Sequence, residues 1–328
     1  MPSVDVAIPC YQYGRYLEDC VTSILRQEIR DLRILVIDNA STDNTREVAE
    51  RMSARDSRVQ IVSHATNLGH HASFNEGMDW ARAEYFMLLG ADDCLSPGAL
   101  ARAISIMEKH PSVNLTHGAE YRSTFDQGLP DISQPRAVNW QLIKGIDLIE
   151  RLCRTGRCHI MAQTVVVRTA AQKSIGHYRA SLSHTDDLEM WLRFASLGNV
   201  AETNAIQGVR RLHPDNRSSS IANVHQCDIL VEQAFQSFFA QEGARLPDSR
   251  RLQKMVKQAL SDRAYWGALA NLVRGDFRLS RDLMGFALSR TPSSALFPPI
   301  NYLWHRRDAI QHIGQVVSDR LVSARPLS

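Results

Sequence analysis

The sequence predicts an α/β fold in which a mostly parallel sheet is flanked by helices and followed by an all-helical C-terminal extension. Through the first 120 residues, short apolar runs alternate with amphipathic segments at the spacing of strand–helix–strand crossover units. After residue 220 the apolar pattern shows helical periodicity alone. In such a sheet, the polar residues that follow the strands gather at one edge, where ligands bind.

The elements of the first 120 residues follow from their apolar periodicity. Each predicted strand is a short apolar run, and each predicted helix repeats apolar residues every three or four positions. Asp43 stands before the segment TREVAERMSAR and is predicted as its N-cap. The predicted strands are 4–9, 33–37, 59–62, 85–89 and 113–117. The predicted helices are 16–27, 45–55, 73–82 and 97–106.

The rest of the chain is divided near residue 220. Residues 122–140 contain Gly128, Pro130 and Pro135 and are predicted as a surface loop. We expect one domain over 1–220, with halves of about 1–120 and 121–220, and a helical region over 221–328. Further predicted strands are 164–167 and 205–212. Further predicted helices are 144–153, 186–197, 221–241, 249–273, 277–289 and 301–321.

The charge of the chain is unevenly distributed. The 328 residues include 38 Lys and Arg and 35 Asp and Glu, a formal net charge of +3. Residues 221–328 hold 14 basic and 9 acidic side chains, a balance of +5, which leaves residues 1–220 at −2. A basic tail suits either a solvated helical face or an anionic membrane. Without interleaved aromatic residues, it does not indicate a nucleic-acid partner.

Composition also limits the class of protein and its compartment. A chain with 44% hydrophobic residues and a small net charge is not expected to be disordered. Its six cysteines include no CxxC pair, so no zinc site or disulfide framework is predicted. The start MPSVDVAIPC lacks the features of a signal peptide, and no run of about 18 apolar residues occurs. We therefore expect a cytoplasmic protein with free thiols.

Polar residues follow the first two predicted strands where a ligand site is expected. Pro9 and Tyr11 follow the first strand, and Tyr11 is either a stacking surface for a flat base or an ordinary packed aromatic. Asp38 ends the second strand. Its carboxylate either accepts hydrogen bonds from a nucleoside or turns the chain, and it lies too early to cap the next helix.

Carboxylates and a histidine follow the later strands. Asp92 and Asp93 end the fourth strand, and two adjacent carboxylates repel each other unless a cation or hydrogen-bond donors lie nearby. Mg²⁺ and Mn²⁺ take such oxygen ligands, although a helix-entry turn is the alternative. Asp187 lies among acids at a predicted helix start, a position that acids favour in any case. His213 follows the last strand and is either structural or a metal ligand.

Taken together, these motifs resemble glycosyltransferase family 2, the inverting nucleotide-sugar transferases of the GT-A fold, whose mostly parallel sheet is Rossmann-like. The family's P-x-Y-N and V-D-D-G-S-x-D-x-T segments match PCYQ and VIDNASTDNT. Its N-x-G and D-x-D-D segments match NLG and GADDCLSP, and its E-D-x-x-L-W-x-R helix matches DDLEMWLR. Its R-x-H-x-x-N-x-S strand end matches RLHPDNRSS. The resemblance covers about residues 3–220 and leaves out the tail.

The resemblance implies a function and a role for each matched residue. The chain would move a sugar from a UDP- or dTDP-sugar to an acceptor hydroxyl, with Asp187 as the catalytic base. The acceptor would be a glycan or lipid-linked molecule in bacterial-type polysaccharide, O-antigen or other glycoconjugate synthesis. The implied donor contacts are Pro9, Tyr11, Asp38, Asn67, Gly69, Asp92 and Asp93. The implied ligands of a Mn²⁺ or Mg²⁺ ion are Asp92, Asp93 and His213. We expect Trp140, His159, Trp191 and Arg193 on the acceptor side.

Three positions depart from the family pattern. Gly90 replaces the first Asp of D-x-D-D, which leaves metal binding to the three residues named above. Asn39 replaces the second Asp of the nucleoside motif, and Asp186 replaces the Glu beside the base. The minimum chemistry of an inverting transfer is still present. It needs one base for the acceptor hydroxyl and a cation for the leaving diphosphate, and no second carboxylate nucleophile.

Other functions are less well supported by the sequence. A dinucleotide oxidoreductase needs G-x-G-x-x-G after the first strand, where this chain has PCYQYG. A nucleotidyltransferase needs a Gly-rich basic loop there to cradle a triphosphate. A non-catalytic nucleotide-sugar-binding or scaffold protein of the same fold remains an alternative.

The C-terminal region is predicted as a cap, a homo-oligomer contact or a peripheral membrane contact. Residues 296–307 combine apolar and aromatic side chains with two Arg residues. This composition suits either an anchor at the inner face of the cell membrane or a packed helix.

Overall fold

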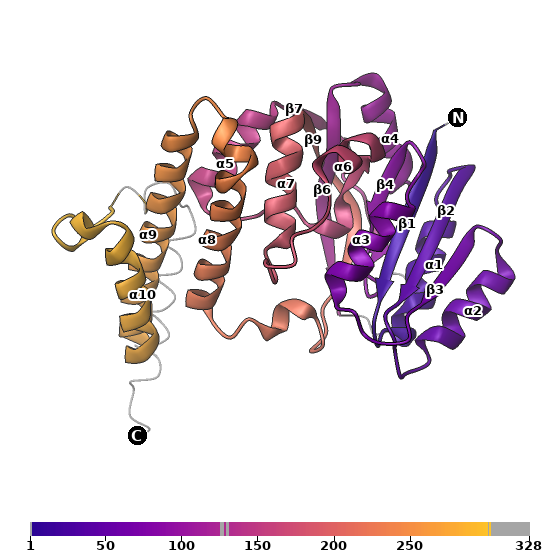
Figure 1. Cartoon of the computed structure of the whole chain (residues 1–328), viewed down its shortest axis with the longest axis horizontal. Helices are drawn as coiled ribbons and strands as arrows, with labels where there is room; N and C mark the ends of the chain where they lie inside the picture. Colours follow the sequence, from indigo (N-terminus) through magenta and orange to yellow (C-terminus); the bar gives the residue numbers. More distant parts are fainter. Residues whose placement is uncertain (1, 125–127, 129–130, 301, 303–328) are drawn as a thin grey trace. The chain divides into compact units, whose positions relative to one another are not determined.

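The structure is a computed structural model that describes residues 2–124, 128, 131–300 and 302. The chain forms two compact units. The first comprises Met1–Ile149 with Cys158–Ser220, and the second comprises Glu150–Arg157 with residues from Ile221 onward. Figure 1 labels most of the helices and strands.

The first unit is built on one sheet with the strand order β3-β2-β1-β4-β8-β6-β9-β5, and with β7 beside β9. Strands β3, β2, β1 and β4 are parallel to their neighbours, and so are β6 and β9. The antiparallel pairings, made by β8, β5 and β7, are shorter. The strands are β1 Ser3–Cys10, β2 Asp31–Asp38, β3 Val59–Ser63, β4 Tyr85–Leu88, β5 Cys94–Leu95, β6 Val113–Ser123, β7 Trp140–Ile143, β8 Val166–Arg168 and β9 Asn199–Arg211.

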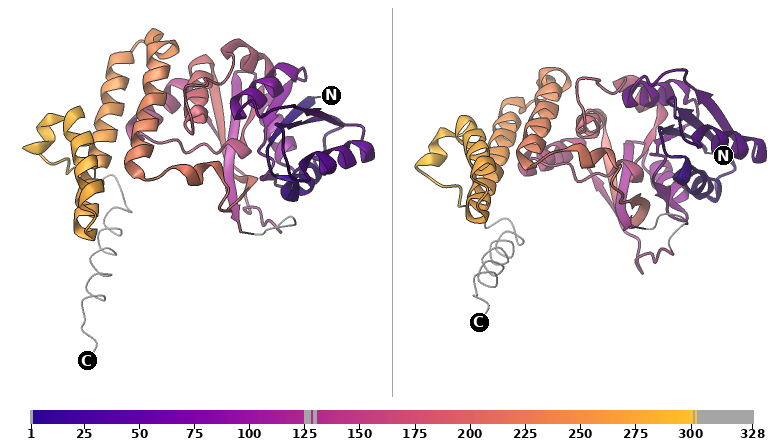
Figure 2. Two further views of the ribbon diagram at one scale, coloured as in Figure 1. Left: turned by 60° about the horizontal axis from the view of Figure 1, so that its bottom comes forward. Right: turned by 90° about the horizontal axis from the view of Figure 1, so that it is seen from below.

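Helices cover both faces of the parallel strands (Figures 1 and 2). Val4, Val6 and Ile8 of β1 pack into one apolar core with residues of α1, α2 and α4. Ala7 points to the opposite face, where a Cβ on Gly77 of α3 would lie 2.5 Å from the Ala7 Cβ. Glycine at this position therefore lets α3 lie close against the sheet. The helices of the chain to this point are α1 Gly14–Leu25, α2 Thr45–Arg55, α3 His70–Trp80, α4 Ala99–Lys109, α5 Gly145–Thr155, α6 Thr169–Ile175 and α7 Asp186–Leu197.

The predicted α/β class with a largely parallel sheet is confirmed, and the differences concern short elements. The sequence did not predict β5, β7 or α6, which are two to seven residues long and carry too few residues to show a period. β7 begins at Trp140, the last residue of the predicted surface loop. β6 and β9 are longer than predicted because polar residues continue both strands along their parallel pairing.

The second unit is helical in the residues that the structure describes. Its main helices are α8 Val224–Ala240, α9 Ser249–Arg274 and α10 Phe277–Arg290. Figures 1 and 2 show α9 and α10 side by side. Phe235, Phe238, Leu260 and Leu283 are buried, which accounts for the helical apolar periodicity of this region. The helix predicted at 301–321 lies outside the described residues, apart from residue 302.

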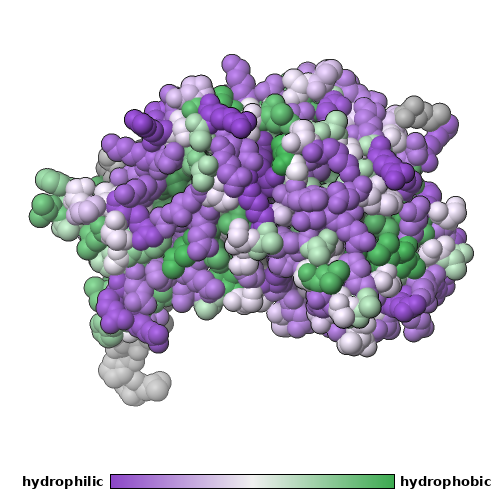
Figure 3. All heavy atoms as spheres, in the orientation of Figure 1, coloured by the Kyte–Doolittle hydropathy of each residue, from purple (hydrophilic) through white to green (hydrophobic). Residues whose placement is uncertain are grey.

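Large apolar side chains are exposed near the end of the described chain. Phe277, Leu296 and Phe297 are exposed by 70%, 80% and 76%. On the face drawn in Figure 3, hydrophilic residues predominate and hydrophobic groups are scattered among them, including on the segment after α10. Residues 301 and 303–307 of the predicted interfacial stretch lie outside the described residues. Among the helices that the structure describes, none is both long and apolar enough to cross a bilayer.

Asp5 joins three segments of the first unit. Its side chain is fully buried in β1, and its carboxylate accepts hydrogen bonds from the Arg33 guanidinium of β2. It also accepts the backbone N–H groups of Arg82 and Ala83, at 2.6 and 2.8 Å. The turn between α3 and β4 is therefore attached to the start of the sheet through one carboxylate.

Asp5→Ala should lower the free energy of unfolding by about 3 kcal/mol, because two backbone N–H groups and a guanidinium lose their acceptor. Urea denaturation measures this change, with an unchanged m value. Asp56→Ala is the control, since the Asp56–Arg58 ion pair is partly exposed and is expected to contribute less than about 1 kcal/mol. Equal losses in the two variants would contradict the role given to Asp5.

Candidate functional site

The carboxyl ends of β1, β2 and β4 lie at one edge of the sheet. Cys10 and Asp38 are paired in register at the ends of β1 and β2. The Leu89 N–H, just after β4, donates to the Ala7 carbonyl of β1. The segment after β9 reaches the same edge, where His213 contacts Asp92. The predicted strand-end residues are thus brought together as parallel pairing requires.

The loops after β1 and β2 are joined by hydrogen bonds. Asp38 is 2% exposed, and its Oδ1 accepts the Ser41 N–H at 3.0 Å, so this carboxylate turns the chain as well as lining the edge. The Gln12 N–H donates to the Ser41 hydroxyl at 3.0 Å. Gln12 and Ala40 both have φ values of 62°, a left-handed conformation in each loop. Pro9 lies within β1, and Tyr11 is 44% exposed at the edge.

Asp43 serves the start of two helices. Its Oδ1 accepts the Thr45 N–H at the first residue of α2, and its Oδ2 accepts the Gly14 N–H at the first residue of α1, both at 3.0 Å. Asn44 occupies the N-cap position of α2, but its side chain makes no capping hydrogen bond. The predicted capping function of Asp43 is therefore present, one residue earlier than an ordinary N-cap.

Asn39 organises the loop between β3 and α3. Its amide donates to Asn67 Oδ1 at 2.9 Å, and its carbonyl accepts the Leu68 N–H at 2.9 Å and faces His64 Nδ1 at 3.0 Å. Asn67 Oδ1 also accepts the Gly69 N–H, where a φ of +83° favours glycine. The amide at position 39 thus holds Asn67 and Gly69 in place, which an aspartate could not do through the same donor.

Asp92 and His213 form the second part of the edge. His213 Nε2 lies 3.2 Å from Asp92 Oδ2, and the Asn216 amide donates to the same oxygen at 3.1 Å. Asn216 Oδ1 accepts the His213 N–H at 2.8 Å, which closes a tight turn. The His213 ring lies against Tyr16, with centroids 4.9 Å apart. The aromatic contact and the turn fix the imidazole beside Asp92.

Asp93 and Gly90 complete the turn after β4. Asp93 Oδ1 accepts the Arg211 N–H at 3.3 Å. Burial, and then the neighbouring Asp92 charge, raise the pKa of Asp93 well above its usual value. A Cβ at Gly90 would lie 2.9 Å from Asp92 Oδ1. Glycine in place of an aspartate therefore leaves room for the two carboxylates that follow.

Asp186 is a buried carboxylate at the first residue of α7. Arg217 donates to both its oxygens, at 2.9 and 3.1 Å, and His71 Nε2 lies 3.1 Å from Oδ2. Burial opposes ionisation, but the contacts with His71 and Arg217 outweigh it and lower the pKa of Asp186 to about 2. Asp186 is thus a carboxylate held in a fixed position.

Asp187 has the opposite electrostatic environment. Burial, and then the adjacent Asp186 charge, raise the pKa of Asp187 to about 7. The Tyr178 hydroxyl donates to Asp187 Oδ1 at 3.3 Å. Two adjacent carboxylates with pKa values pushed apart are typical of sites that use one of them for proton transfer.

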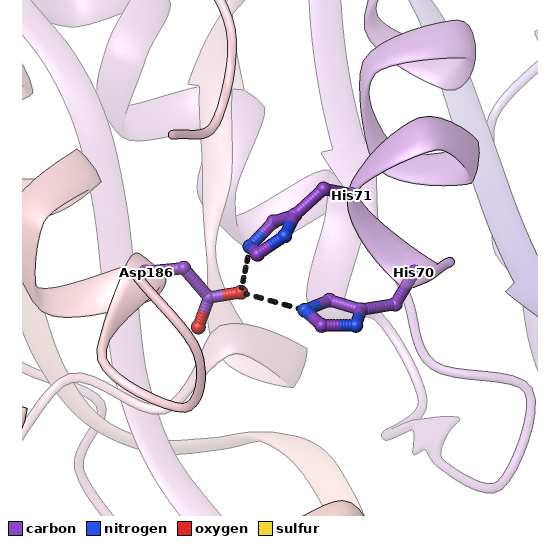
Figure 4. Close-up of side chains that lie close together, drawn as sticks. All are labelled: His70, His71 and Asp186. Atoms are coloured by element: carbon purple, nitrogen blue, oxygen red, sulfur yellow. Dashed lines mark hydrogen bonds and ion pairs between the residues drawn. The ribbon is translucent and has the colours of Figure 1, made fainter. Parts of the chain in front are cut away.

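His70 and His71, the first residues of α3, lie beside Asp186 (Figure 4). The ligand atoms of His70, His71 and Asp186 all lie within 4.8 Å of one another, and no other trio of His, Cys, Asp or Glu in the described residues is gathered so closely. Burial, and then the charges of Arg217 and His71, lower the pKa of His70 to about 4. The predicted metal set of Asp92, Asp93 and His213 is less closely gathered, because Asp93 turns toward the Arg211 N–H.

The residues predicted on the acceptor side come from three segments of the first unit. Trp140, in β7, packs against the apolar core, and the His159 ring lies 6.4 Å from that of His117. Trp191 and Arg193 are 4% and 2% exposed. The Arg193 guanidinium donates to Glu189 and to two backbone carbonyls. Trp191 and Arg193 thus belong to the core of the first unit, and an acceptor-side role for the four residues stays a prediction.

Sequence reasoning missed several residues of this site. Asn216 stands in the matched segment RLHPDNRSS and was the easiest to find. Arg217 stands in the same segment, and Tyr178 ends the segment GHY that precedes the DDLEMWLR helix. His70 and His71 carry no local pattern that distinguishes them from surface or core residues. Only the fold brings these residues together, from segments up to 147 positions apart, as in His70 and Arg217.

Sequence comparison finds relatives among glycosyltransferases. An uncharacterized glycosyltransferase of Haemophilus influenzae is 26% identical over 69% of this chain and 70% of its own length. The chondroitin synthase of Escherichia coli is 27% identical over 72% of this chain, which spans 32% of that longer protein.

Solved structures share the fold at low sequence identity. TarS 1–349 of S. aureus, in complex with UDP-GlcNAc, has a TM-score of 0.63 and 14% identity, covering 90% of this chain and 92% of that chain. A mannosyltransferase of Pyrobaculum calidifontis, in complex with GDP-Man and Mn²⁺, has a TM-score of 0.60 and 15% identity, covering 96% of this chain and 84% of that chain.

The sheet topology, shared with these structural neighbours, shows that this chain has the GT-A fold. The model of glycosyl transferase family 2 matches residues 5–168, half of the chain. The chain belongs to glycosyl transferase family 2, which confirms the resemblance of its motifs and the enzyme class that they implied.

Asn39→Ala should loosen the loop between β3 and α3 without unfolding the chain, because three hydrogen-bonding contacts of this loop depend on one side chain. Amide hydrogen exchange should speed up at Leu68 and Gly69, while exchange in β1 stays unchanged. Ser53→Ala, which removes a hydrogen bond to the Val59 carbonyl at the other end of β3, is the control. Unchanged protection of Leu68 in Asn39→Ala would show that the loop does not depend on this residue.

Proposed function

We propose that this chain is an inverting glycosyltransferase that moves a sugar from a UDP- or dTDP-sugar to an acceptor hydroxyl, in the synthesis of a polysaccharide, O-antigen or related glycoconjugate. The observation that carries this proposal is the segment 213–217. His213 and Asn216 contact Asp92 at one end, and Arg217 holds Asp186 at the other. One short segment thus joins the predicted donor side to the predicted base side.

On the base side, Asp187 is the group best suited to accept the proton of the acceptor hydroxyl. Its neighbour Asp186 is occupied by Arg217 and His71, whereas Asp187 has the Tyr178 hydroxyl as its hydrogen-bond donor. A base with a pKa near the working pH combines a free carboxylate with useful basicity. In this proposal Tyr178 orients the Asp187 carboxylate.

On the donor side, Asp38 and Tyr11 bind the nucleoside and the 67–69 loop borders it. The buried Asp38 accepts hydrogen bonds from the base, and the exposed Tyr11 ring offers it a flat surface. The Asn39 amide donates to Asn67, which accepts the Gly69 N–H, and these hydrogen bonds hold the conformation of the loop. The UDP-GlcNAc complex of TarS, which shares this fold, supports a nucleotide-sugar donor.

The residues beside Asp92 suit a divalent cation. Asp92 Oδ2 and His213 Nε2 lie 3.2 Å apart, a separation compatible with two ligands of one ion. Asp93 would add a further carboxylate by turning from the Arg211 N–H toward the ion. When bound, Mn²⁺ or Mg²⁺ would act as a Lewis acid that neutralises charge on the leaving diphosphate. The Mn²⁺ in the Pyrobaculum calidifontis complex supports this assignment.

The transfer proposed here is one displacement at the anomeric carbon. Asp187 takes the proton from the acceptor hydroxyl, whose oxygen forms the new glycosidic bond as the bond to the nucleoside diphosphate breaks. A single displacement inverts the configuration, and no carboxylate becomes bonded to the sugar. Asp187 lies in α7 and Asp92 lies in the turn after β4. In this proposal the base and the residues that bind the leaving diphosphate therefore come from different elements.

The other assignments stay predictions. A glycan or lipid-linked acceptor, a homo-oligomer, a peripheral contact with the inner face of the cell membrane and a cytoplasmic location are compatible with this function. The alternative is a non-catalytic nucleotide-sugar-binding protein. An assay of wild-type protein with Mn²⁺ and a panel of acceptors distinguishes the two. A binding protein would bind the donor and release no nucleoside diphosphate.

Asp187→Asn should reduce kcat by about 10²–10⁴-fold while leaving donor binding nearly intact, because the base is removed but the donor side is not. The donor is first identified by thermal shift with a panel of UDP-, dTDP- and GDP-sugars and Mn²⁺. Asp79→Asn, which changes an exposed carboxylate paired with His177, should leave kcat unchanged. Turnover by Asp187→Asn at the wild-type rate would overturn the base assignment.

Removal of divalent ions with EDTA should abolish transfer, and Mn²⁺ or Mg²⁺ should restore it. Asp92→Asn should raise the Mn²⁺ concentration needed for half-maximal activity at least tenfold, because it removes one charged ligand. Asp56→Asn is the matched control on the surface of the first unit. Full activity of the EDTA-treated enzyme would exclude the metal-assisted step but leave the base assignment open to its own test.

A further inference from the structure

The trio His70, His71 and Asp186 has the geometry of a metal centre distinct from the ion proposed at Asp92. His71 Nε2 lies 3.1 Å and His70 Nε2 3.7 Å from the same oxygen, Asp186 Oδ2. Both imidazoles point toward that oxygen (Figure 4). Ligands around a tetrahedral zinc ion, with bonds of about 2.0–2.1 Å, lie about 3.3 Å from one another. Small side-chain movements would bring all three atoms into that arrangement.

One atom of this trio lacks a partner. His70 Nε2 is buried and makes no hydrogen bond. Its distance of 3.7 Å from Asp186 Oδ2 is too long for a hydrogen bond, although it allows an electrostatic attraction. A buried polar atom without a partner needs an explanation, and a missing ion is one of the ordinary explanations. The rest of the His70 side chain is 37% exposed, so solvent reaches the rim of the cluster.

Arg217 bears on this site in two ways. Its guanidinium donates to both oxygens of Asp186 and so holds the carboxylate in one orientation, as the outer partners of metal ligands do. Its positive charge also opposes a cation on that carboxylate. The carboxylate of Asp187, the next residue, interacts electrostatically with Arg217 and so offsets part of this opposition. The two acids together can balance Arg217 and part of the charge of a divalent ion.

We propose that His70, His71 and Asp186 form a binding site for Zn²⁺ or a similar transition-metal ion, a site separate from the Mn²⁺ or Mg²⁺ position at Asp92. Two imidazoles and one carboxylate favour such ions over Mg²⁺, which prefers oxygen ligands. Three protein ligands leave a position open for water or a substrate oxygen. The site goes beyond the proposed function, since it can bind metal whether or not the chain transfers a sugar.

The position of the ion has a consequence for the proposed reaction. Asp186 is the residue directly before the base Asp187, and His71 lies near Tyr178, with ring centroids 6.5 Å apart. An ion held there would place a positive charge beside the carboxylate that must accept a proton. Zn²⁺ should therefore inhibit transfer that is supported by saturating Mn²⁺, and it should do so through His70 and His71.

The test uses the full chain, freed of any histidine tag and treated with EDTA before dialysis. Titration with Co²⁺ should give a visible absorption band that saturates at one equivalent, and one equivalent of Zn²⁺ should remove it. His70→Ala and His71→Gln should each weaken Co²⁺ binding at least tenfold. Glutamine at 71 can still donate to Asp186, so this variant removes the ligand and keeps the hydrogen bond.

Two controls separate this site from the others. His177→Ala alters an exposed His–Asp pair of similar spacing, at 2.9 Å, and should leave the titration unchanged. Asp92→Asn should also leave it unchanged, which separates the trio from the site of the proposed function. The proposal is overturned if no band forms in folded wild-type protein, or if the band survives both His variants, or if Asp92→Asn alone removes it. None of these outcomes depends on sugar transfer.

Discussion

The buried ion pair between Arg217 and Asp186 is the contact on which the geometry of the site depends. A carboxylate with no exposed side-chain surface at the start of α7 needs a partner, since an uncompensated buried charge is unstable. Arg217 reaches it from the segment after β9, and the same segment carries His213 and Asn216 to Asp92. The ion pair therefore ties α7 to the edge of the sheet where β4 and β9 end.

The acids of the site have different hydrogen-bond partners. Asp38 accepts the Ser41 N–H in a turn, Asp92 contacts His213 and Asn216, and Asp186 contacts Arg217 and His71. Asp187 has one neutral hydroxyl as its hydrogen-bond donor and a negative charge beside it on Asp186. Asp187 therefore has a higher proton affinity than Asp186. Adjacent residues of the same chemical type thus acquire different roles because their surroundings differ.

The substitution at position 39 shows how a departure from a family motif can preserve structure. An amide can donate and accept at once, whereas an ionised carboxylate only accepts. Asn39 uses both functions, with Asn67 on one side and Leu68 on the other. Gly90 illustrates a different case, since the missing side chain makes room for Asp92. The motif departures are therefore part of a consistent local geometry at the ends of β2 and β4.

The sequence by itself determined the α/β class, the order of the long elements and the strand-end positions of Asp38, Asp92 and His213. These follow from local periodicity and from the rule that parallel strands present their ends at one edge. The two- to four-residue strands β5 and β7 were not predictable, because so few residues show no period. Only the tertiary structure decided that Trp191 and Arg193 are core residues and that His70, His71 and Arg217 surround Asp186. The physical reason is that burial and charge compensation depend on contacts between distant segments, which no local pattern records.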